Sequence, residues 1–522
     1  MRQRQYRKRA TSVLALLGSL LSLVAAGQEP TAEYIDELAA RAMERFQTPG
    51  IAIGVLKDGE LVYAAGHGVR DIRYDDPIDV DTIFQIASLT KAFTTAALGI
   101  LVDDGKLHWD DRVIDHLPEF RMYDPWVTRE FTIRDLLTHR SGLGLGAGDL
   151  LFWPKQVSTR KEVVKAIRHL KPETSFRTAY AYDNLLYVIA GELLSAVSGM
   201  PWEDFVEKRI MAPLEMSDCR ALPSRVSDND NRATPHMLVE GKLQTTFFSG
   251  GGATAAAGAV NCNVAGLAKW AAVHLAHGAL PDGSRLISEE THADLWQPVT
   301  LIPVDDLSRD HGRTHFIAYA LGWGLKDFFG YLYVSHSGGL QGMTTYIALL
   351  PEKNIAVIVL TNQFSRAYRA VASGVLNSYV SDTPADWVEI FAQSDAEISG
   401  DAEREVEEAF GNRDAESKPS LPLAAYAGVY SDRWYGDVIV EQDDDGLLML
   451  FSRSELMTGP LEHFQYDTFV ARWRDRSLLA DAYATFSLGA DGSVESITMR
   501  PVSPQTDFSY DFQDLDLRRV AE

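Results

Sequence analysis

The chain has 522 residues, of which 46% are hydrophobic, and it carries a formal net charge of −24. The apolar share is typical of a globular protein, and the length predicts two or three structural units. The acidic balance argues against nucleic acid and anionic membrane surfaces as partners.

The first 27 residues are expected to form an export signal. A basic start precedes an apolar core from Ser12 to Val24 and the small residues Ala25 to Gly27, which is the order of a cleavable signal peptide. We therefore expect a bacterial protein in the periplasm or outside the cell. No cysteine follows the apolar core, so a lipid anchor is not indicated, and an uncleaved signal serving as a membrane anchor stays open.

Two elements are predicted before the first motif. Residues Ala32 to Phe46 follow the pattern of an amphipathic helix. The runs Ile51 to Leu56 and Leu61 to Ala65 flank Asp58-Gly59, a pair typical of a tight hairpin turn. This hairpin predicts an antiparallel sheet.

The stretch Phe84 to Ala96, FQIASLTKAFTTA, places Ser88 three residues before Lys91 at the start of an apolar helical pattern. Positions three apart share one face of a helix, and burial favours the neutral amine that can accept a proton from the serine. The same spacing recurs at Ser158 and Lys161 in a charged amphipathic segment, where a helix N-cap and a solvated lysine are the better interpretation. Ser88 therefore needs partners to be credible as a nucleophile.

A helix-rich middle part follows. Helices are predicted at Thr132 to His139, Lys161 to Leu170 and Asn184 to Val197. The Gly- and Ala-rich residues Ser249 to Gly258 lack the Gly-Lys-Ser/Thr ending of a phosphate loop, which argues against nucleotide binding. Cys219 and Cys262 are the only two cysteines; an exporting compartment permits a bridge, but buried free thiols are the favoured expectation.

The first partner signal is Tyr182-Asp183-Asn184, the only Y-x-N in the chain. A tyrosine beside Ser88 and Lys91 can relay the proton, and a neighbouring ammonium is expected to lower the pKa of its phenol from about 10. Asn184 can hold the lysine and the substrate amide. A core tyrosine with Asn184 as a helix N-cap is the structural alternative.

The second partner signal is His336-Ser337-Gly338-Gly339, predicted to follow the end of a strand from Tyr331 to Ser335. The amides of Gly339 and Ser88 would form an oxyanion hole, while His336 contacts the substrate. A hairpin turn with a surface histidine is the alternative. The strands expected in this region are Ile317 to Trp323, Tyr331 to Ser335, Thr344 to Leu350 and Asn354 to Leu360.

Because the first hairpin precedes the helical part and these strands follow it, both ends of the domain are expected to complete one sheet. The helical part is then an insertion, with a cleft between the two. An acidic, partly helical linker follows, and the short alternating strands after Leu421 predict a small antiparallel barrel. The fold class is α/β (α+β), with predicted boundaries at 1–27 (signal), 28–382 (hydrolase), 383–420 (linker) and 421–522 (barrel).

The three motifs together resemble the serine β-lactamase and penicillin-binding-protein superfamily, within it the class C β-lactamase-related peptidases and esterases. The resemblance covers about Ala32 to Val380 and includes the segments DTIFQIASLTKAFT, IRDLLTHRSGL and AYDNLLYVIAGEL. The residues after Leu421 resemble the lipocalin-like domain often fused to these enzymes.

The resemblance implies that Ser88 is the acylated nucleophile, that Lys91 and Tyr182 relay the proton, and that Asn184 orients the lysine and the bound amide. His336 and Gly338 fall on the third motif, where lactamases usually carry lysine. A histidine with a pKa near 6.5 is mostly neutral at pH 7, which disfavours efficient β-lactamase activity and resembles peptidases that handle D-amino acids.

We therefore expect a secreted serine peptidase or amidase of Ser-Lys-Tyr type. It would act on short peptides with D-residues or non-ribosomal bonds, such as peptidoglycan stems or linearised cyclic peptides of the microcystin kind. A carboxylesterase or weak β-lactamase and a non-catalytic penicillin-binding or sensor protein are the alternatives. No cofactor, metal, nucleic acid or stable membrane association is expected; a homo-oligomer stays open, and the terminal domain is expected to narrow the cleft or to build that oligomer.

Overall fold

The structure is a computed structural model, which describes residues 27, 29–155, 158–227, 230–249 and 251–520. The predicted export signal lies outside the described residues, except for Gly27. Within the described ranges no single helix is long and apolar enough to cross a membrane, and one bent pair, Leu185–Ser198 with Trp202–Met211, meets that test only when taken together.

The main sheet has eight strands in the order β2-β1-β12-β11-β10-β9-β8-β7, and every neighbouring pair is antiparallel. Strand β1 pairs with β12, with Ile53 opposite Val359, so both ends of the domain complete the sheet as predicted. The strands are β1 (Gly50–Lys57), β2 (Glu60–Gly68), β7 (Thr300–Ile302), β8 (Ile317–Tyr319), β9 (Gly324–Phe328), β10 (Tyr331–Leu340), β11 (Met343–Leu350) and β12 (Ile355–Thr361).

The first hairpin forms as its turn residues predict. Asp58 and Gly59 both have positive φ, 52° and 84°, as a two-residue turn that matches the strand twist requires. The second hairpin differs from the prediction, because His336 to Gly339 lie inside β10 rather than after it. The turn instead falls at Gln341-Gly342, between Leu340 and Met343.

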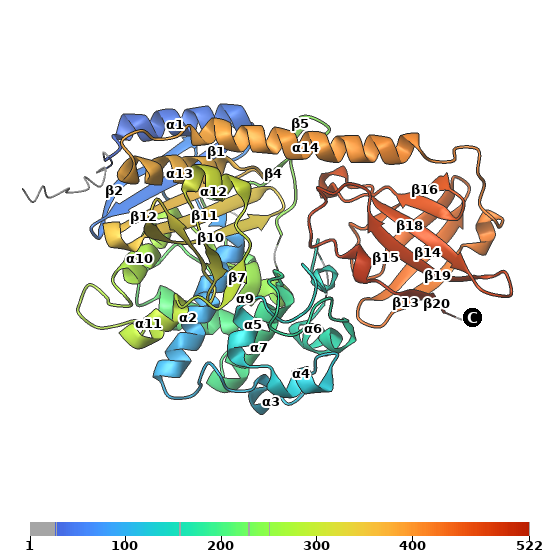
Figure 1. Cartoon of the computed structure of the whole chain (residues 1–522), viewed down its shortest axis with the longest axis horizontal. Helices are drawn as coiled ribbons and strands as arrows, with labels where there is room; N and C mark the ends of the chain where they lie inside the picture. The colour runs from blue at the N-terminus through green and yellow to red at the C-terminus, as the bar shows by residue number, and fades with distance from the viewer. Residues whose placement is uncertain (1–26, 28, 156–157, 228–229, 250, 521–522) are drawn as a thin grey trace, which may run out of the picture.

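Helices cover both faces of this sheet (Figure 1). On one face α1 (Ala32–Phe46), α13 (Ala367–Val380) and the start of α14 (Trp387–Gly411) share one apolar core with the sheet. On the other face lie α2 (Thr90–Asp103), α10 (Val264–Leu275) and the inserted helical part. The remaining helices are α3 (Val113–His116), α4 (Pro125–Glu130), α5 (Ile133–Leu137), α6 (Arg160–Ala166), α7 (Leu185–Ser198), α8 (Trp202–Val206), α9 (Ala255–Gly258), α11 (Glu289–Leu295) and α12 (Asp306–Gly312).

Two short strand pairs lie outside the main sheet. β3 (Phe84–Gln85) pairs with β6 (Asn261–Cys262), and β4 (His236–Val239) pairs with β5 (Lys242–Thr245). The backbone of Asn261 also pairs with that of Arg220, which brings the adjacent Cys262 and Cys219 together. A disulfide joins these cysteines, so the expectation of free thiols is wrong.

The acidic segment after the sheet domain forms one helix of 25 residues, α14. Its first turns are anchored by buried Trp387, Val388 and Phe391, whereas Ala402 is its only buried residue beyond Ala392. Figure 1 shows this helix running from above the sheet to a position above the second domain.

The second domain is a closed antiparallel barrel of eight strands. Buried aromatic rings pack against one another in it, among them Tyr430, Phe469 and Phe486. The strands are β13 (Gly428–Asp432), β14 (Gly436–Asp443), β15 (Gly446–Phe451), β16 (Thr458–Gln465), β17 (Thr468–Ala471), β18 (Ala482–Leu488), β19 (Val494–Pro501) and β20 (Leu517–Arg519).

Candidate active site

Ser88 lies at the point where β3 turns into α2. The strand ends at Gln85, a 3₁₀ turn spans Ala87–Leu89, and the α-helix itself begins at Thr90. Ala87 has a positive φ of 50°. Ser88 is half-buried and lines a cavity of about 780 Å³, with walls from the sheet, the helical part and the barrel.

Lys91 lies fully buried beneath Ser88, on the first turn of α2. Its Nζ is 3.0 Å from Ser88 Oγ, 2.7 Å from Asn184 Oδ1 and 2.9 Å from the Ala257 carbonyl oxygen. Burial lowers the pKa of the amine to about 7, although the carboxylates of Asp149 and Asp183 act in the opposite direction. A large share of the amine is therefore neutral near pH 7 and able to accept a proton.

Tyr182 faces the same space, and its ring lies 4.9 Å from Lys91 Nζ. Burial raises the pKa of its phenol well above 10, while a hydrogen bond with Ser88 acts in the opposite direction. The expected lowering of this pKa is therefore wrong, because loss of solvent is the largest effect on the phenol. Tyr182 holds its proton throughout the neutral range.

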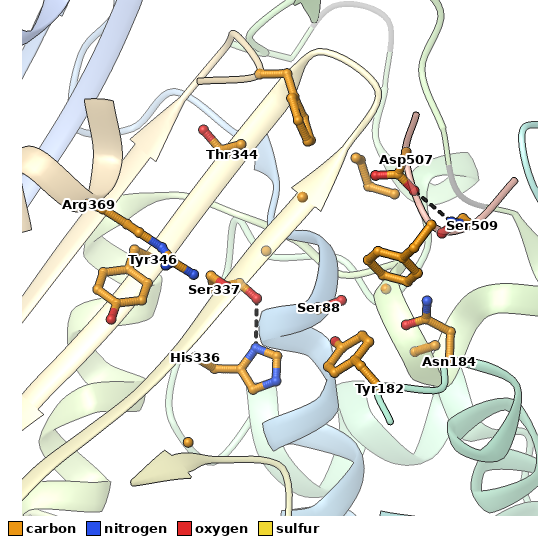
Figure 2. Close-up of a pocket in the computed structure, with 18 of the residues that line it drawn as sticks. Ser88, Tyr182, Asn184, His336, Ser337, Thr344, Tyr346, Arg369, Asp507 and Ser509 are labelled. Carbon is orange, nitrogen blue, oxygen red and sulfur yellow. Dashed lines mark hydrogen bonds between the residues drawn. The ribbon is translucent and has the colours of Figure 1, made fainter. Parts of the chain in front are cut away.

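Asn184 precedes α7, but its side chain does not cap that helix. Its Oδ1 accepts a hydrogen bond from Lys91, and its Nδ2 donates to Asp149 Oδ2 at 2.7 Å. The amide is thus held from both ends and turned toward the lysine. Figure 2 shows Asn184 and Tyr182 beside Ser88 on the wall opposite β10.

His336 lies on β10 and lines the cavity. Its Nδ1 donates to the Ser337 carbonyl at 2.7 Å, and its Nε2 accepts from the Tyr319 hydroxyl at 2.9 Å. Burial, with a further contribution from Lys91, lowers the pKa of the imidazole to about 3. The ring is therefore neutral across the physiological range, a stronger form of the neutrality expected from the sequence.

The edge of β10 beside Ser88 is open. Strand β9 pairs with β10 only as far as Ser335, so in the described part of the chain no strand pairs with the next residues on that side. Leu340 and Met343 close a two-residue turn with β11, and hydrogen-bonding pairs alternate from that point. The amide of Gly339 consequently points to the open edge.

Gly338 lies where β10 crosses the turn that carries Ser88. A Cβ atom here would overlap the Ile86 carbonyl oxygen and lie 2.9 Å from Ala87 Cβ. The absence of a side chain therefore allows the strand to approach the nucleophile.

The far end of the cavity carries two basic side chains, and the carboxylate of Asp305 lies near one of them. Arg369 of α13 and Lys326 of β9 both line it, and within the described part of the chain neither has a carboxylate at ion-pair distance. The Arg369 Nε donates to the Tyr368 hydroxyl at 3.0 Å, and burial lowers the pKa of Lys326 to about 8. Figure 2 places Arg369 on the opposite side of Ser88 from Asp507.

Sequence reasoning missed three contributions to this site: the pair Arg369 and Lys326, the buried carboxylate of Asp149, and a barrel segment that includes Asp507 and Ser509. Asp149 begins a short 3₁₀ turn, Asp149–Leu151, in the helical part, and no periodic pattern or motif marks it. The nearest signal is that Asp149 directly precedes the apolar residues Leu150 to Phe152. A carboxylate buried beside such residues is costly unless it has a polar partner.

The structure thus brings Ser88, Lys91, Tyr182, Asn184 and His336 around one cavity, with Gly338 and Gly339 on its β10 wall. The second S-x-x-K copy is separate from it: Thr159 caps α6 through a capping box, and Lys161 is exposed. The geometry permits acyl transfer by serine with an amine base, while the individual roles remain predictions.

Comparison with known proteins gives two family matches. The family described as Beta-lactamase matches residues 35–378, and a domain of unknown function, DUF3471, matches residues 412–519. The chain is 27% identical to Unguisins hydrolase ungD' of Aspergillus campestris, over 89% of this chain and 88% of that protein. It is 28% identical to Penicillin-binding protein 4 of Amycolatopsis lactamdurans, over 64% of this chain and 83% of that protein.

Among solved structures, the octameric penicillin-binding protein homologue from Pyrococcus abyssi aligns with a TM-score of 0.57. The alignment covers 94% of this chain and all of that chain, at 22% identity. At that identity the likeness concerns the fold.

Proposed function

Because the chain belongs to the Beta-lactamase family, we propose that it is a serine hydrolase that forms an acyl-enzyme on Ser88. The observation that carries the proposal is the 3.0 Å contact between Ser88 Oγ and the buried amine of Lys91, whose pKa is lowered to about 7. A neutral amine at that distance is placed as a general base.

The proposed reaction begins when Lys91 accepts the hydroxyl proton and Ser88 Oγ attacks the substrate carbonyl carbon. The amides of Ser88 and Gly339 stabilise the resulting oxyanion. Tyr182, which retains its proton because of burial, gives that proton to the leaving group. Water then attacks the acyl carbon and gives one proton to the Tyr182 phenolate, while protonated Lys91 returns its proton to Ser88 Oγ as the acyl–oxygen bond breaks, so that all three groups regain their starting forms.

We propose short peptides that contain D-residues or non-ribosomal bonds as the substrates. Two observations support this class: a relative named as a hydrolase matches nearly the whole chain, and the cavity has a cationic and an acidic end. A free carboxylate would lie toward Arg369 and Lys326, and a free ammonium toward Asp507. The neutral His336 would contribute shape and hydrogen bonding rather than charge.

We also propose that the protein is exported through its N-terminal segment. The Cys219–Cys262 disulfide supports this, because such bonds persist in oxidising compartments. N-terminal sequencing of the protein recovered from the periplasm or medium should find a start close to Gly27, and a start at Met1 would contradict export by cleavage.

A fluorophosphonate probe tests the nucleophile. Intact mass should show one adduct on the wild type and none on Ser88→Ala. Lys91→Ala should lose labelling, whereas Lys161→Ala, which replaces an exposed lysine with the same spacing from Ser158, should label like the wild type. An unlabelled wild type would refute the acyl-enzyme and leave a non-catalytic protein as the better explanation.

A substrate screen then tests the class. D- and L-aminoacyl peptides with free ends should be compared with their N-acetylated and C-amidated forms, with p-nitrophenyl esters and with β-lactams. The proposal predicts the highest kcat/KM for a D-containing peptide with free ends. A higher kcat/KM for esters would favour the carboxylesterase. Equal rates for peptides with free and with blocked ends would show that the charged ends of the cavity do not select the substrate.

A further inference from the structure

The barrel reaches into the active-site cavity through the segment that follows β19. Asp507, Phe508 and Ser509 all line the cavity, although they lie more than 400 residues after Ser88 in the sequence. Figure 2 shows Asp507 and Ser509 next to Asn184.

A continuous chain of hydrogen bonds runs from this segment to the nucleophile. Ser509 Oγ donates to Asp149 Oδ2 at 3.0 Å, and Asn184 Nδ2 donates to the same oxygen at 2.7 Å. The other end of the Asn184 amide accepts from Lys91, which contacts Ser88. The barrel is thus two side chains away from the catalytic amine.

Further contacts hold the barrel against the loop that carries Asp149 and against Tyr182. The carboxylate of Asp511 accepts the backbone N–H of Gly148. The ring of Phe508 meets that of Tyr182 edge to face at 5.9 Å. Ser509 is 8% exposed and Asp149 fully buried, so water does not readily substitute for the serine hydroxyl.

The orientation of the Asn184 amide depends on Asp149. A carboxylate oxygen accepts only from the NH₂ end of an amide, and this leaves the carbonyl end to face Lys91. The reversed amide would direct its NH₂ at the amine and its oxygen at the carboxylate. Asp149 therefore decides which atom the lysine meets.

Asp149 also carries one of the two carboxylates that favour the charged form of Lys91, the other being that of Asp183. Burial raises the pKa of this carboxyl to about 7, while the hydrogen bonds from Asn184 and Ser509 and the charge of Lys91 favour its ionised form. The acidic groups Asp183, Asp507 and Asp511 face it as well, and so does Tyr182. Removal of one donor shifts this balance toward the neutral acid.

We propose that Asp149 and Ser509 are positioning residues of the active site. The barrel then supplies the Ser509 hydroxyl, which keeps Asp149 and Asn184 in the arrangement that orients Lys91 for acylation. The proposal rests on the proposed serine hydrolase function. It assigns the second domain a part in the chemistry of the first.

The test compares Ser509→Ala with Ser509→Thr and Thr246→Val in the full-length protein. Thr246 makes a separate hydroxyl contact between the domains, 3.0 Å from Ser477 Oγ. Among the described residues no hydrogen bond joins it to Ser509, Asp149 or Asn184, so it controls for loosened docking. On the pH plateau above the acidic limb, acylation by the fluorophosphonate should be about tenfold slower in Ser509→Ala, since a hydrogen bond to a charged group is lost. Ser509→Thr and Thr246→Val should stay near the wild-type rate.

The pH profile separates positioning from general loosening. In Ser509→Ala a larger share of Asp149 is neutral, Lys91 loses an attractive charge, and the acidic limb should move to lower pH; Asp149→Asn should move it in the same direction. If the barrel merely undocked, water would reach Lys91, its pKa would rise, and the limb would move to higher pH.

An unchanged rate and profile in Ser509→Ala would overturn the proposal, as would an upward shift or an equal loss in Thr246→Val. The proposed function fails separately, because it fails only if the wild type is not acylated on Ser88.

Discussion

Burial gives opposite protonation states to the two groups beside Ser88. The pKa of Lys91 is lowered to about 7 and that of Tyr182 is raised well above 10, with loss of solvent as the largest cause in both cases. Desolvation disfavours the charged form of either group. The amine is therefore suited to take a proton and the phenol to give one.

This division predicts the pH dependence of acylation. Only the neutral form of Lys91 accepts the Ser88 proton, so the rate should rise with pH and level off above about 7. Lys91→Arg keeps a cation that cannot deprotonate and should lose about 10²- to 10⁴-fold in rate. Single-turnover labelling from pH 5 to 9 measures both, and a flat wild-type profile would remove Lys91 as the base.

At the scale of single residues, the sequence predicts which residues form the site better than it predicts their protonation states. Ser88, Lys91, Tyr182 and Asn184 stand in short motifs whose spacing survives folding, and the structure brings them together. The neutral Lys91 follows from the burial that the apolar pattern predicts, whereas the pKa of Tyr182 depends on a burial that its motif does not encode. Asp149 escapes prediction because its partners come from two distant parts of the chain.

At the scale of elements, β10 and the turn before α2 form the tightest approach in the site. The missing side chain of Gly338 lets the strand contact Ile86 and Ala87, directly before the nucleophile. The open edge of the same strand then faces the cavity. Strand β10 thus contacts the turn that carries Ser88 and also forms one wall of the cavity.

Gly338→Ala should therefore damage both stability and activity. The added methyl overlaps backbone, so we expect a loss of about 1–3 kcal/mol in the free energy of unfolding together with slower acylation. Gly339→Ala is the matched control for stability, because its nearest neighbour is the Phe364 ring at 3.4 Å. Urea unfolding of both variants measures the difference, and equal stabilities would contradict the close approach.

The strands that the sequence predicts are those with strong apolar runs. β11 and β12 agree within one residue at either end, whereas β10 extends five residues past its expected end. Its extension runs through His336 to Gly339, where polar side chains and glycines resemble a turn. Pairing with β11 overrides that local preference.

At the scale of the whole molecule, the disulfide links the inserted helical part to the strand beside the nucleophile. Cys219 and Cys262 are 43 residues apart, and Cys262 lies in β6, which pairs with β3 just before Ser88. The bond therefore limits how far this part of the chain opens when the protein unfolds.

Replacement of both cysteines by alanine should lower the free energy of unfolding by about 2–4 kcal/mol. Labelling of Ser88 at low temperature should be retained, since neither sulfur lines the cavity. Thermal unfolding with and without reductant measures the effect; a wild type that is insensitive to reductant and equal to the double variant would show that the bond does not stabilise the protein.

The helix α14 affects how readily the barrel and the loop that carries Asp149 stay in contact. Its 25 residues span about 37 Å at 1.5 Å per residue, and because it joins both domains, the barrel approaches the loop as part of the same molecule. Short flexible linkers give joined partners an effective concentration of about 10⁻³ M, and the value is highest when the length of the linker matches the span. The few contacts around Ser509 can then stay formed although they would hold a separate barrel only weakly. A barrel supplied as a separate chain would need a concentration in the same range to make these contacts.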